Sequence, residues 1–256
     1  MRGGGIPLDF TRGKTAKAML EIDWTYPVYK PTTPDRKPGD KTVAQEVERA
    51  LPIEQAYELV ADGDRRPLLI LRECEICKGT DHALLSRTLD NEQTVLLTHW
   101  FRCVKLPTNV LKGTHPFHAL FEKREGEDRV PHLFFADPDG GNRLALPGDQ
   151  SQSELWNVMF DYLDRCYGES AKEAIKGLRK LLSQYDKLDA EEQLVRGRID
   201  EEIERNGPKS NKLKKFDKQL EKVAKERDKL RKQEQELRDL ALRPPVEAPA
   251  EGAPGK

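Results

Sequence analysis

The sequence has few cysteines, few aromatic residues, no long apolar run and almost no net charge. Four of its 256 residues are cysteine, and their uneven spacing excludes a disulfide framework. No run approaches the roughly 20 apolar residues of a membrane span, and the N-terminus lacks the apolar stretch of a secretory signal. The formal net charge of −1 gives no overall attraction to polyanions. We therefore expect a soluble, cytoplasmic protein that contacts no membrane, and a nucleic-acid partner is not expected.

The composition changes along the chain and divides it into four segments. Residues 1–41 are rich in proline and glycine and are expected to be extended. Residues 42–168 mix apolar runs with turn residues, and residues 169–242 consist almost entirely of helix-forming residues. Residues 243–256 are rich in Pro, Ala, Glu and Gly, which predicts a disordered tail.

The first segment contains a cluster of large apolar residues: Ile22, Trp24, Tyr26, Val28 and Tyr29. Two interpretations remain open. The cluster packs on the outside of the following domain as a strap, or it is a docking peptide for another protein. We favour the strap.

The second segment predicts alternating helices and strands. Periodic apolar residues predict helices, and short apolar runs between turn residues predict strands. In chain order, we expect a helix over 42–61, a strand over 68–71, a helix containing the first two cysteines and Ala83, Leu84, Leu85 and Leu89, a strand over 94–104, a short helix over 116–123, strands over 129–136 and 143–146, and a helix over 151–167. This order predicts an α/β sheet with a hairpin at its end.

Cys74 and Cys77 form a Cys-x-x-Cys pair directly after the apolar run that ends at Leu71. A cysteine at the start of a helix favours the thiolate, because unpaired N–H groups there stabilise negative charge. Two residues three apart lie on the same side of a helix, so the pair can form a disulfide. A strand followed by this pair and a helix is typical of a redox motif. Half of a metal site and two inert apolar residues are the alternatives.

Residues 42–168 resemble a thioredoxin-fold domain, of the bacterial thioredoxin-like or DUF255-like variety. The resemblance rests on the lead-in over 56–67, on the run from Cys74 to Lys78, on the strand ending at 101–105 and on the segment 130–140. It implies that Cys74 attacks a disulfide and that Cys77 resolves the mixed disulfide. It also implies that Pro131 is a cis-proline facing the cysteine pair.

The sequence departs from the thioredoxin pattern at three places. Glu75-Ile76 replaces the usual Gly-Pro between the cysteines, and Glu73 replaces the aromatic residue before the first cysteine. Leu68 stands where thioredoxins carry a buried acid, six residues before Cys74. These changes imply a cysteine pair that is poised differently from that of a general reductase.

The charges around Cys74 act in opposite directions. The carboxylates of Glu73 and Glu75 raise the pKa of the thiol, because they oppose the thiolate. Arg72 and Lys78 lower this pKa for the converse reason. The sequence alone does not give the sign of the sum.

A structural zinc site is an alternative role for the cysteine pair. His115 and His118 are three residues apart and could complete a set of four ligands with Cys74 and Cys77. His82 and His99 are further candidates. Against zinc, the gap between the cysteines and these histidines is longer than in a compact zinc finger. The other two cysteines, Cys103 and Cys166, fall in apolar stripes and are expected to pack in the core.

The third segment predicts an antiparallel coiled-coil hairpin. Apolar residues recur in steps of three and four from Leu213 to Ala241, with Arg227 and Glu234 as polar exceptions. Gly207-Pro208 permits a sharp reversal, and Ser210 or Asn211 could cap the second helix. Residues 189–204 hold seven acids and two bases, whereas residues 209–232 hold eleven bases and four acids. Opposite local charges favour helices that fold back on each other.

The sequence thus predicts a thioredoxin-like α/β domain followed by an α-helical antiparallel coiled-coil hairpin. The expected function is thiol–disulfide exchange through Cys74 and Cys77 on a protein partner, with Pro131 shaping the site and with no cofactor. The first alternative is a redox-silent scaffold whose hairpin binds a protein partner or forms a homodimer. The second alternative is structural zinc at the cysteine pair.

Overall fold

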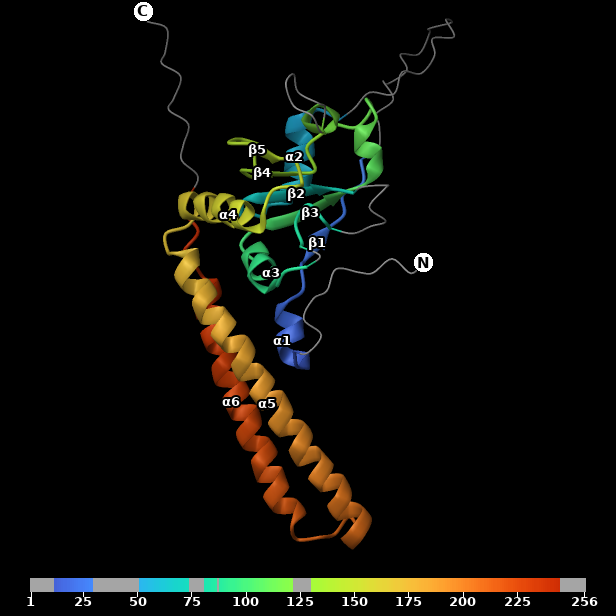
Figure 1. Cartoon of the computed structure of the whole chain (residues 1–256), viewed down its shortest axis with the longest axis vertical. Helices are drawn as coiled ribbons and strands as arrows, with labels where there is room; N and C mark the ends of the chain where they lie inside the picture. Colours follow the sequence, from blue (N-terminus) through green and yellow to red (C-terminus); the bar gives the residue numbers. More distant parts are fainter. Residues whose placement is uncertain (1–11, 30–50, 74–80, 87, 122–129, 245–256) are drawn as a thin grey trace, which may run out of the picture.

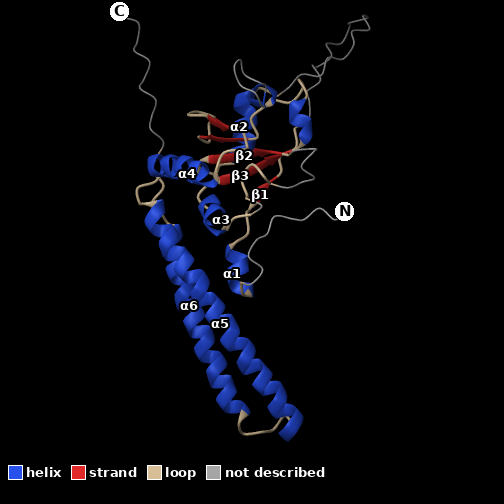
Figure 2. Cartoon of the chain, viewed as in Figure 1, coloured by secondary structure: helices blue, strands red, loops and turns tan. Residues whose placement is uncertain are grey.

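A computed structural model describes residues 12–29, 51–73, 81–86, 88–121 and 130–244. Among these residues, one five-stranded sheet is covered by helices on both faces, and two long helices extend away from it (Figures 1 and 2). The chain is therefore mixed α/β with a helical pair, as the sequence predicts. None of the described helices combines the length and the apolar composition needed to cross a membrane.

The sheet has the strand order β1-β3-β2-β4-β5. Its parallel part consists of β1 (Trp24–Thr25), β3 (Arg102–Leu106) and β2 (Leu68–Arg72). The hairpin of β4 (Leu133–Ala136) and β5 (Leu144–Leu146) joins β2 in antiparallel orientation. The turn before β5 is closed by a 2.8 Å hydrogen bond from Gly140 N to Asp137 O. The predicted α/β sheet with a hairpin at its end is confirmed.

The two faces of the sheet bury different sets of helices. One face, with Leu69, Leu71 and Phe135, packs on α3 (Glu92–Thr98), α4 (Gln152–Cys166) and the first half of α5 (Ala171–Asn206). The other face, with Leu68 and Ile70, packs on α2 (Ile53–Ala61) and on two 3₁₀ turns, η1 (Thr108–Leu111) and η2 (His118–Phe121). Burial on both faces explains why the central strands are apolar throughout.

Helix α2 and helix α4 agree with the sequence. Of the helix expected over 42–61, the described part is α2, while residues 42–50 lie outside the described residues. Helix α4 begins at a capping box in which the Ser151 hydroxyl accepts from Glu154 N and the Glu154 carboxylate accepts from Ser151 N. The helix expected over 151–167 is therefore confirmed, and Ser151 caps it.

The strand predicted over 94–104 is wrong in its first half. Glu92–Thr98 is helix α3, and strand β3 begins only at Arg102. Asp90 starts the helix by accepting a 2.8 Å hydrogen bond from Glu92 N. The helix is buried almost all round between the sheet and α5, and its apolar residues Val95, Leu96 and Leu97 are consecutive and show no helical period. A short apolar run of this kind does not distinguish a buried helix from a buried strand.

The segment after the cysteine pair is not helical where the structure describes it. Residues 81–85 form a turn in which Leu84 N and Leu85 N both donate to Asp81 O. Leu84 and Leu85 are buried, but Leu89 is 57% exposed. The helix expected to present Leu89 on its apolar face is therefore wrong over these residues, whereas residues 74–80 lie outside the described residues.

The N-terminal segment contains a helix that the sequence analysis missed. Helix α1 (Lys14–Met19) precedes the prolines and packs on α5. Asp189 of α5 accepts hydrogen bonds from both Thr15 N and Thr15 Oγ1 at 2.7 Å, so a neighbouring helix supplies the cap. The apolar cluster that follows runs along the domain: Trp24 lies in β1, Ile22 and Tyr29 pack on the cores, and Tyr26 and Val28 are exposed. The strap is thus confirmed for three of the five residues.

Helices α5 and α6 (Leu213–Arg238) form the predicted hairpin. They reverse at Gly207, which adopts a positive φ of 78°. Lys212, and neither Ser210 nor Asn211, is the N-cap residue of α6. The Ser210 hydroxyl donates to Glu202 at 2.6 Å and accepts a 3.3 Å hydrogen bond from Lys212 N, so it contacts the start of the helix. Glu202 also accepts from Asn206 and Lys212, so it ties the turn together.

The two polar exceptions in the heptad pattern make interhelical contacts. Arg227 donates to Asp189 at 2.9 Å and to Glu192 at 2.7 Å across the hairpin. Glu234 accepts a 3.0 Å hydrogen bond from Tyr185. Each exception therefore has a partner on α5 that satisfies its polar group.

The first half of α5 belongs to the core of the sheet domain. Its buried residues from Ala171 to Leu188 pack in the same cluster as the sheet, α3 and α4. The domain boundaries proposed at residues 41, 168 and 242 stay predictions, and the core is continuous across residue 168. Beyond Asp189, which contacts α1, the last 17 residues of α5 extend free of the domain, a length of about 25 Å.

Candidate functional site at the end of strand β2

The cysteine pair lies outside the described residues, but the structure describes the residues directly before it, at the end of β2. Arg72 N donates to His132 O at 2.9 Å, and Glu73 N donates to Leu106 O at 2.8 Å. These bonds hold the end of β2 between β3 and the start of β4. Glu73 is the residue that directly precedes Cys74 in the sequence. The end of β2 lies at the carboxyl edge of the parallel strands, where open α/β sheets place their ligand sites.

Pro131 lies beside this point, but its peptide bond is not cis. Among the described residues, which include Val130 and Pro131, no peptide bond is cis. The expected cis-proline is therefore wrong for this structure. Pro131 is buried, and its carbonyl oxygen lies 3.5 Å from Arg72 Nε. The expectation that Pro131 lies near the cysteine pair is consistent with the contact to Arg72, while its role in chemistry stays a prediction.

Arg72 is a buried cation next to the cysteine pair. Its residue is 8% exposed, and its guanidinium carbon lies 5.9 Å from the centre of the Phe121 ring. No carboxylate within the described ranges forms an ion pair with it. Burial lowers the pKa of Arg72, because the charged form loses hydration. A nearby anion, such as a thiolate, would relieve this cost.

Lys105 forms an ion pair with Asp81, the first described residue after the cysteine pair. Its Nζ lies 2.6 Å from Asp81 Oδ1 and 4.7 Å from the centre of the Trp24 ring. Lys105 is the β3 residue that pairs with Leu71 of β2, and Asp81 is the first described residue after the pair. The ion pair therefore ties both ends of the segment 74–80 to the same edge of the sheet. Sequence reasoning missed this contact, because nothing in the sequence relates Lys105 to Asp81.

His132 is a second residue that the sequence analysis did not single out. It follows Pro131 and is half-buried, and its Nδ1 donates to Pro147 O at 3.0 Å. This bond fixes the ring between β4 and the loop before α4. The only sequence signal was its position next to Pro131. His132 adds a titratable group near the end of β2.

Leu68 is the residue that the resemblance aligns with the buried acid of thioredoxins. It is fully buried in the core on the α2 face of the sheet. Its apolar side chain packs among other apolar side chains, as expected for a strand that is buried on both faces.

Of the histidines proposed for zinc, His115 and His118 are neighbours, since His118 N donates to His115 O at 3.0 Å, whereas His99 lies apart from them. His115 is buried, its Nδ1 accepts from Phe117 N at 3.2 Å, and its ring contacts Tyr29 at 5.0 Å. His99 lies on the other side of the domain, bonded to Met19 O. Within the described part of the chain, no group of three potential ligands is arranged to hold a metal ion. The zinc hypothesis stays a prediction, because Cys74 and Cys77 lie outside that part.

The other two cysteines are packed as the sequence predicts. Cys103 is buried in β3, and burial raises the pKa of its thiol to about 12. Cys166 is half-buried at the end of α4, and burial raises the pKa of its thiol as well. Raised thiol pKa values disfavour the thiolate at both positions.

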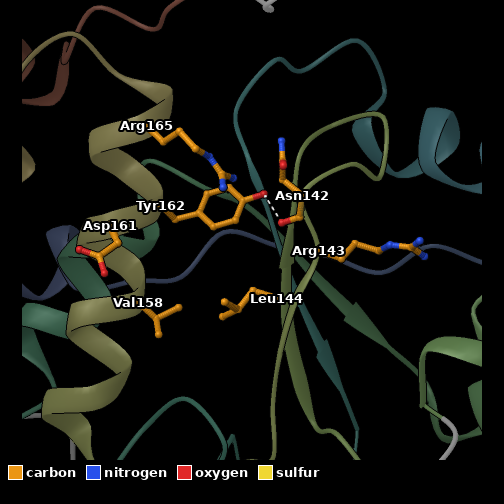
Figure 3. A pocket seen from close by; sticks show the side chains of 7 residues that line it. All are labelled: Asn142, Arg143, Leu144, Val158, Asp161, Tyr162 and Arg165. Carbon is orange, nitrogen blue, oxygen red and sulfur yellow. Dashed lines mark hydrogen bonds between the residues drawn. The ribbon is translucent and has the colours of Figure 1, made fainter. Parts of the chain in front are cut away.

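A separate hollow lies between β5 and α4 (Figure 3). Its volume is about 350 Å³, and Tyr162 points across it toward the loop before β5. The Tyr162 hydroxyl donates to Asp137 at 2.8 Å, and Arg165 stacks 4.1 Å from the centre of the same ring. These side chains satisfy one another, which indicates a structural contact between the hairpin and α4.

Comparisons of the chain with protein-family models, with curated proteins and with solved structures found no match.

Proposed function

We propose that this chain is a thioredoxin-like thiol–disulfide oxidoreductase that acts on a protein partner through Cys74 and Cys77. The observation that carries the proposal is the contact of the β2 end with the segment of Pro131 and His132. Pro131, which we expect to line the substrate groove, contacts Arg72 at the end of β2, and Cys74 is the second residue after Arg72 in the sequence. The parallel strands with a terminal antiparallel hairpin support the thioredoxin-like fold that the resemblance implies.

In the proposed reaction, the Cys74 thiolate attacks one sulfur of a substrate disulfide. The substrate S–S bond breaks, its second sulfur leaves as a thiolate, and a mixed disulfide forms. The Cys77 thiolate then attacks Cys74 Sγ and releases the first substrate sulfur as a thiolate. Two electrons pass from the cysteine pair to the substrate, and the pair ends as a disulfide. An external dithiol must reduce the pair again before another turnover.

Arg72 supports the nucleophile in this proposal. Its buried guanidinium favours a neighbouring thiolate by direct charge attraction. Glu73 opposes the thiolate, and it is half-buried at the end of β2. We expect the cation to dominate, because Arg72 is only 8% exposed and forms no ion pair with a carboxylate of the described residues, so its charge is poorly screened.

The test is the reduction potential of the cysteine pair, measured by thiol trapping in graded dithiothreitol or glutathione buffers. We expect a reversible two-electron transition between about −270 and −120 mV. C74S should abolish the transition and the reduction of insulin disulfides, whereas C103S is the matched control and should change neither. A thiol count that oxidant does not change, in a folded protein, refutes the proposal.

A scaffold function is the second candidate, and the free half of the hairpin favours it. About 25 Å of paired helix extends beyond the domain and makes no contact with the sheet. Leu68 also favours a redox-silent domain, because it removes the acid expected to serve the second thiol. Residues 190–226, which form the free end, can be replaced by a short loop in a test of partner capture. Loss of a partner with an unchanged reduction potential supports the scaffold as an additional function.

A further inference from the structure

Six lysines follow one face of α6. They recur in steps of four, four, three, four and three, so they lie on one side of the helix. All six are exposed. We refer to them as the lysine stripe: Lys214, Lys218, Lys222, Lys225, Lys229 and Lys232.

The lysine stripe faces away from the rest of the molecule. The opposite face of α6, with Val223 and Leu230 buried, packs on α5. Within the described ranges, α5 is the helix that packs extensively on α6, and Figure 1 shows no other element beside its N-terminal half. The stripe is therefore accessible along its whole length.

The charge of the stripe is largely uncompensated. Among the described residues, Lys229 alone of the six forms an ion pair, a 3.0 Å contact with the exposed Glu226. The bases that bond across the hairpin are Arg227 and Lys212, which are not part of the stripe. The near-neutral total charge of the chain thus conceals a local row of positive charge.

The chemistry of the stripe selects among anionic partners. Protein interfaces are depleted in lysine and need an apolar or aromatic centre, which the stripe lacks. A helix that binds a membrane surface inserts an apolar face, and the apolar face of α6 is covered by α5. Proteins that bind single strands stack the bases on exposed aromatic side chains, and the stripe has none. A row of ammonium groups without apolar or aromatic side chains is suited to contacts with the phosphates of a duplex.

We propose that the lysine stripe of α6 docks onto the phosphate backbone of a nucleic-acid duplex, without reading its sequence. The stripe spans 18 residues of helix, a length of about 27 Å, which corresponds to roughly eight base pairs at about 3.4 Å each. Lysine contributes a point charge and not a planar fork for base edges, so the contact is expected to be sequence-independent. This inference does not depend on the chemistry of the cysteine pair.

The test is fluorescence anisotropy of a labelled DNA duplex of about 20 base pairs, titrated with the full chain at several salt concentrations. If four to five stripe lysines contact phosphates, the logarithm of the association constant should fall with the logarithm of salt concentration at a slope of about −4. K218Q/K222Q/K225Q should reduce the slope by about 3 and weaken binding more than about tenfold at low salt. Glutamine is also a good helix former, and circular dichroism checks that α6 is retained.

The matched control is K176Q/K180Q/K187Q on α5. It removes the same charge from three exposed positions outside the stripe and should change the affinity less than about twofold. Three outcomes overturn the proposal: no duplex binding at about 50 mM salt, an equal loss in both triple variants, or binding to phosphatidylserine vesicles or polyglutamate as tight as to the duplex. Unchanged duplex binding by C74S would show that the two proposals stand separately.

Discussion

His99 joins three parts of the molecule and is expected to make its stability depend on pH. It follows α3, its Nε2 donates to Met19 O of α1 at 3.0 Å, and its Nδ1 accepts from Arg238 of α6. Only the neutral imidazole can make both bonds, because the protonated ring has no acceptor. The other charges that face it are Arg66, which opposes protonation, and Asp23, which favours it.

The magnitude follows from the pKa of His99. Burial, and next the charge of Arg238, lower this pKa from 6.5 to about 4. A depressed pKa means that the unfolded state binds the proton more tightly. The contribution of neutral His99 to the free energy of unfolding is therefore fully present above about pH 6.5 and is lost as the pH falls toward about 4. A shift of this size corresponds to about 3 kcal/mol in the free energy of unfolding.

The assay is urea unfolding between pH 7 and pH 4, followed by circular dichroism, for the wild type and for H99Q. Glutamine can donate to Met19 O and accept from Arg238 without titrating, so H99Q keeps the hydrogen bonds and removes the proton site. We expect the wild type to lose about 3 kcal/mol more than H99Q over this range. The carboxylates titrate in both proteins, so their contribution cancels in the difference.

H118Q is the control for loss of an imidazole ring, at a half-exposed position. Parallel pH curves for the wild type and H99Q would refute the reasoning. A titration of His99 near pH 6.5 in the folded protein, observed by NMR, would refute it as well. Burial also lowers the pKa of His115 to about 4, so H99Q should retain part of the acid sensitivity.

Two further substitutions test the packing. G140A should destabilise the fold by about 2–4 kcal/mol in urea unfolding, because Gly140 has a φ of 85° and a Cβ there would lie 2.3 Å from the Tyr57 ring. G63A, with a φ of 75° and open space around it, should cost only about 1 kcal/mol, and equal losses would contradict the packing argument. R227M should lower the free energy of unfolding by about 2–3 kcal/mol, because it leaves the buried Asp189 carboxylate without its cation. A thermal unfolding temperature unchanged by R227M would show that this ion pair is dispensable.

A regular spacing of apolar residues was sufficient to predict the helices that bury only one face. The helical hairpin was predicted from the heptad between Leu213 and Ala241 and from the break at Gly207-Pro208. The core positions of a coiled coil recur in steps of three and four, so they are visible in the sequence. The helix over 151–167 was predicted as well, because its apolar residues recur with a helical period. The turn at Pro138–Gly141 predicted the terminal hairpin of the sheet through its turn residues.

Elements buried on all sides, or held by distant residues, could not be predicted. Helix α3 has no polar face, so its apolar run was mistaken for a strand. Helix α1 is too short to be stable alone, and its cap comes from Asp189 on α5, about 170 residues away in the chain. The conformation of the Val130–Pro131 peptide bond could not be predicted either. The resemblance implied a cis bond, but no peptide bond among the described residues is cis.

For the candidate site, the sequence by itself determined the Cys-x-x-Cys pair, its place after a buried strand and the lysines of α6. The tertiary structure alone decided what surrounds these residues. It placed Pro131 and His132 beside the end of β2, and it paired Lys105 with Asp81 across the same edge. It also buried one face of α6 on α5, which leaves the lysines outside. Local spacing sets the faces of a helix or a strand, but which distant surface covers each face is decided only when the chain packs.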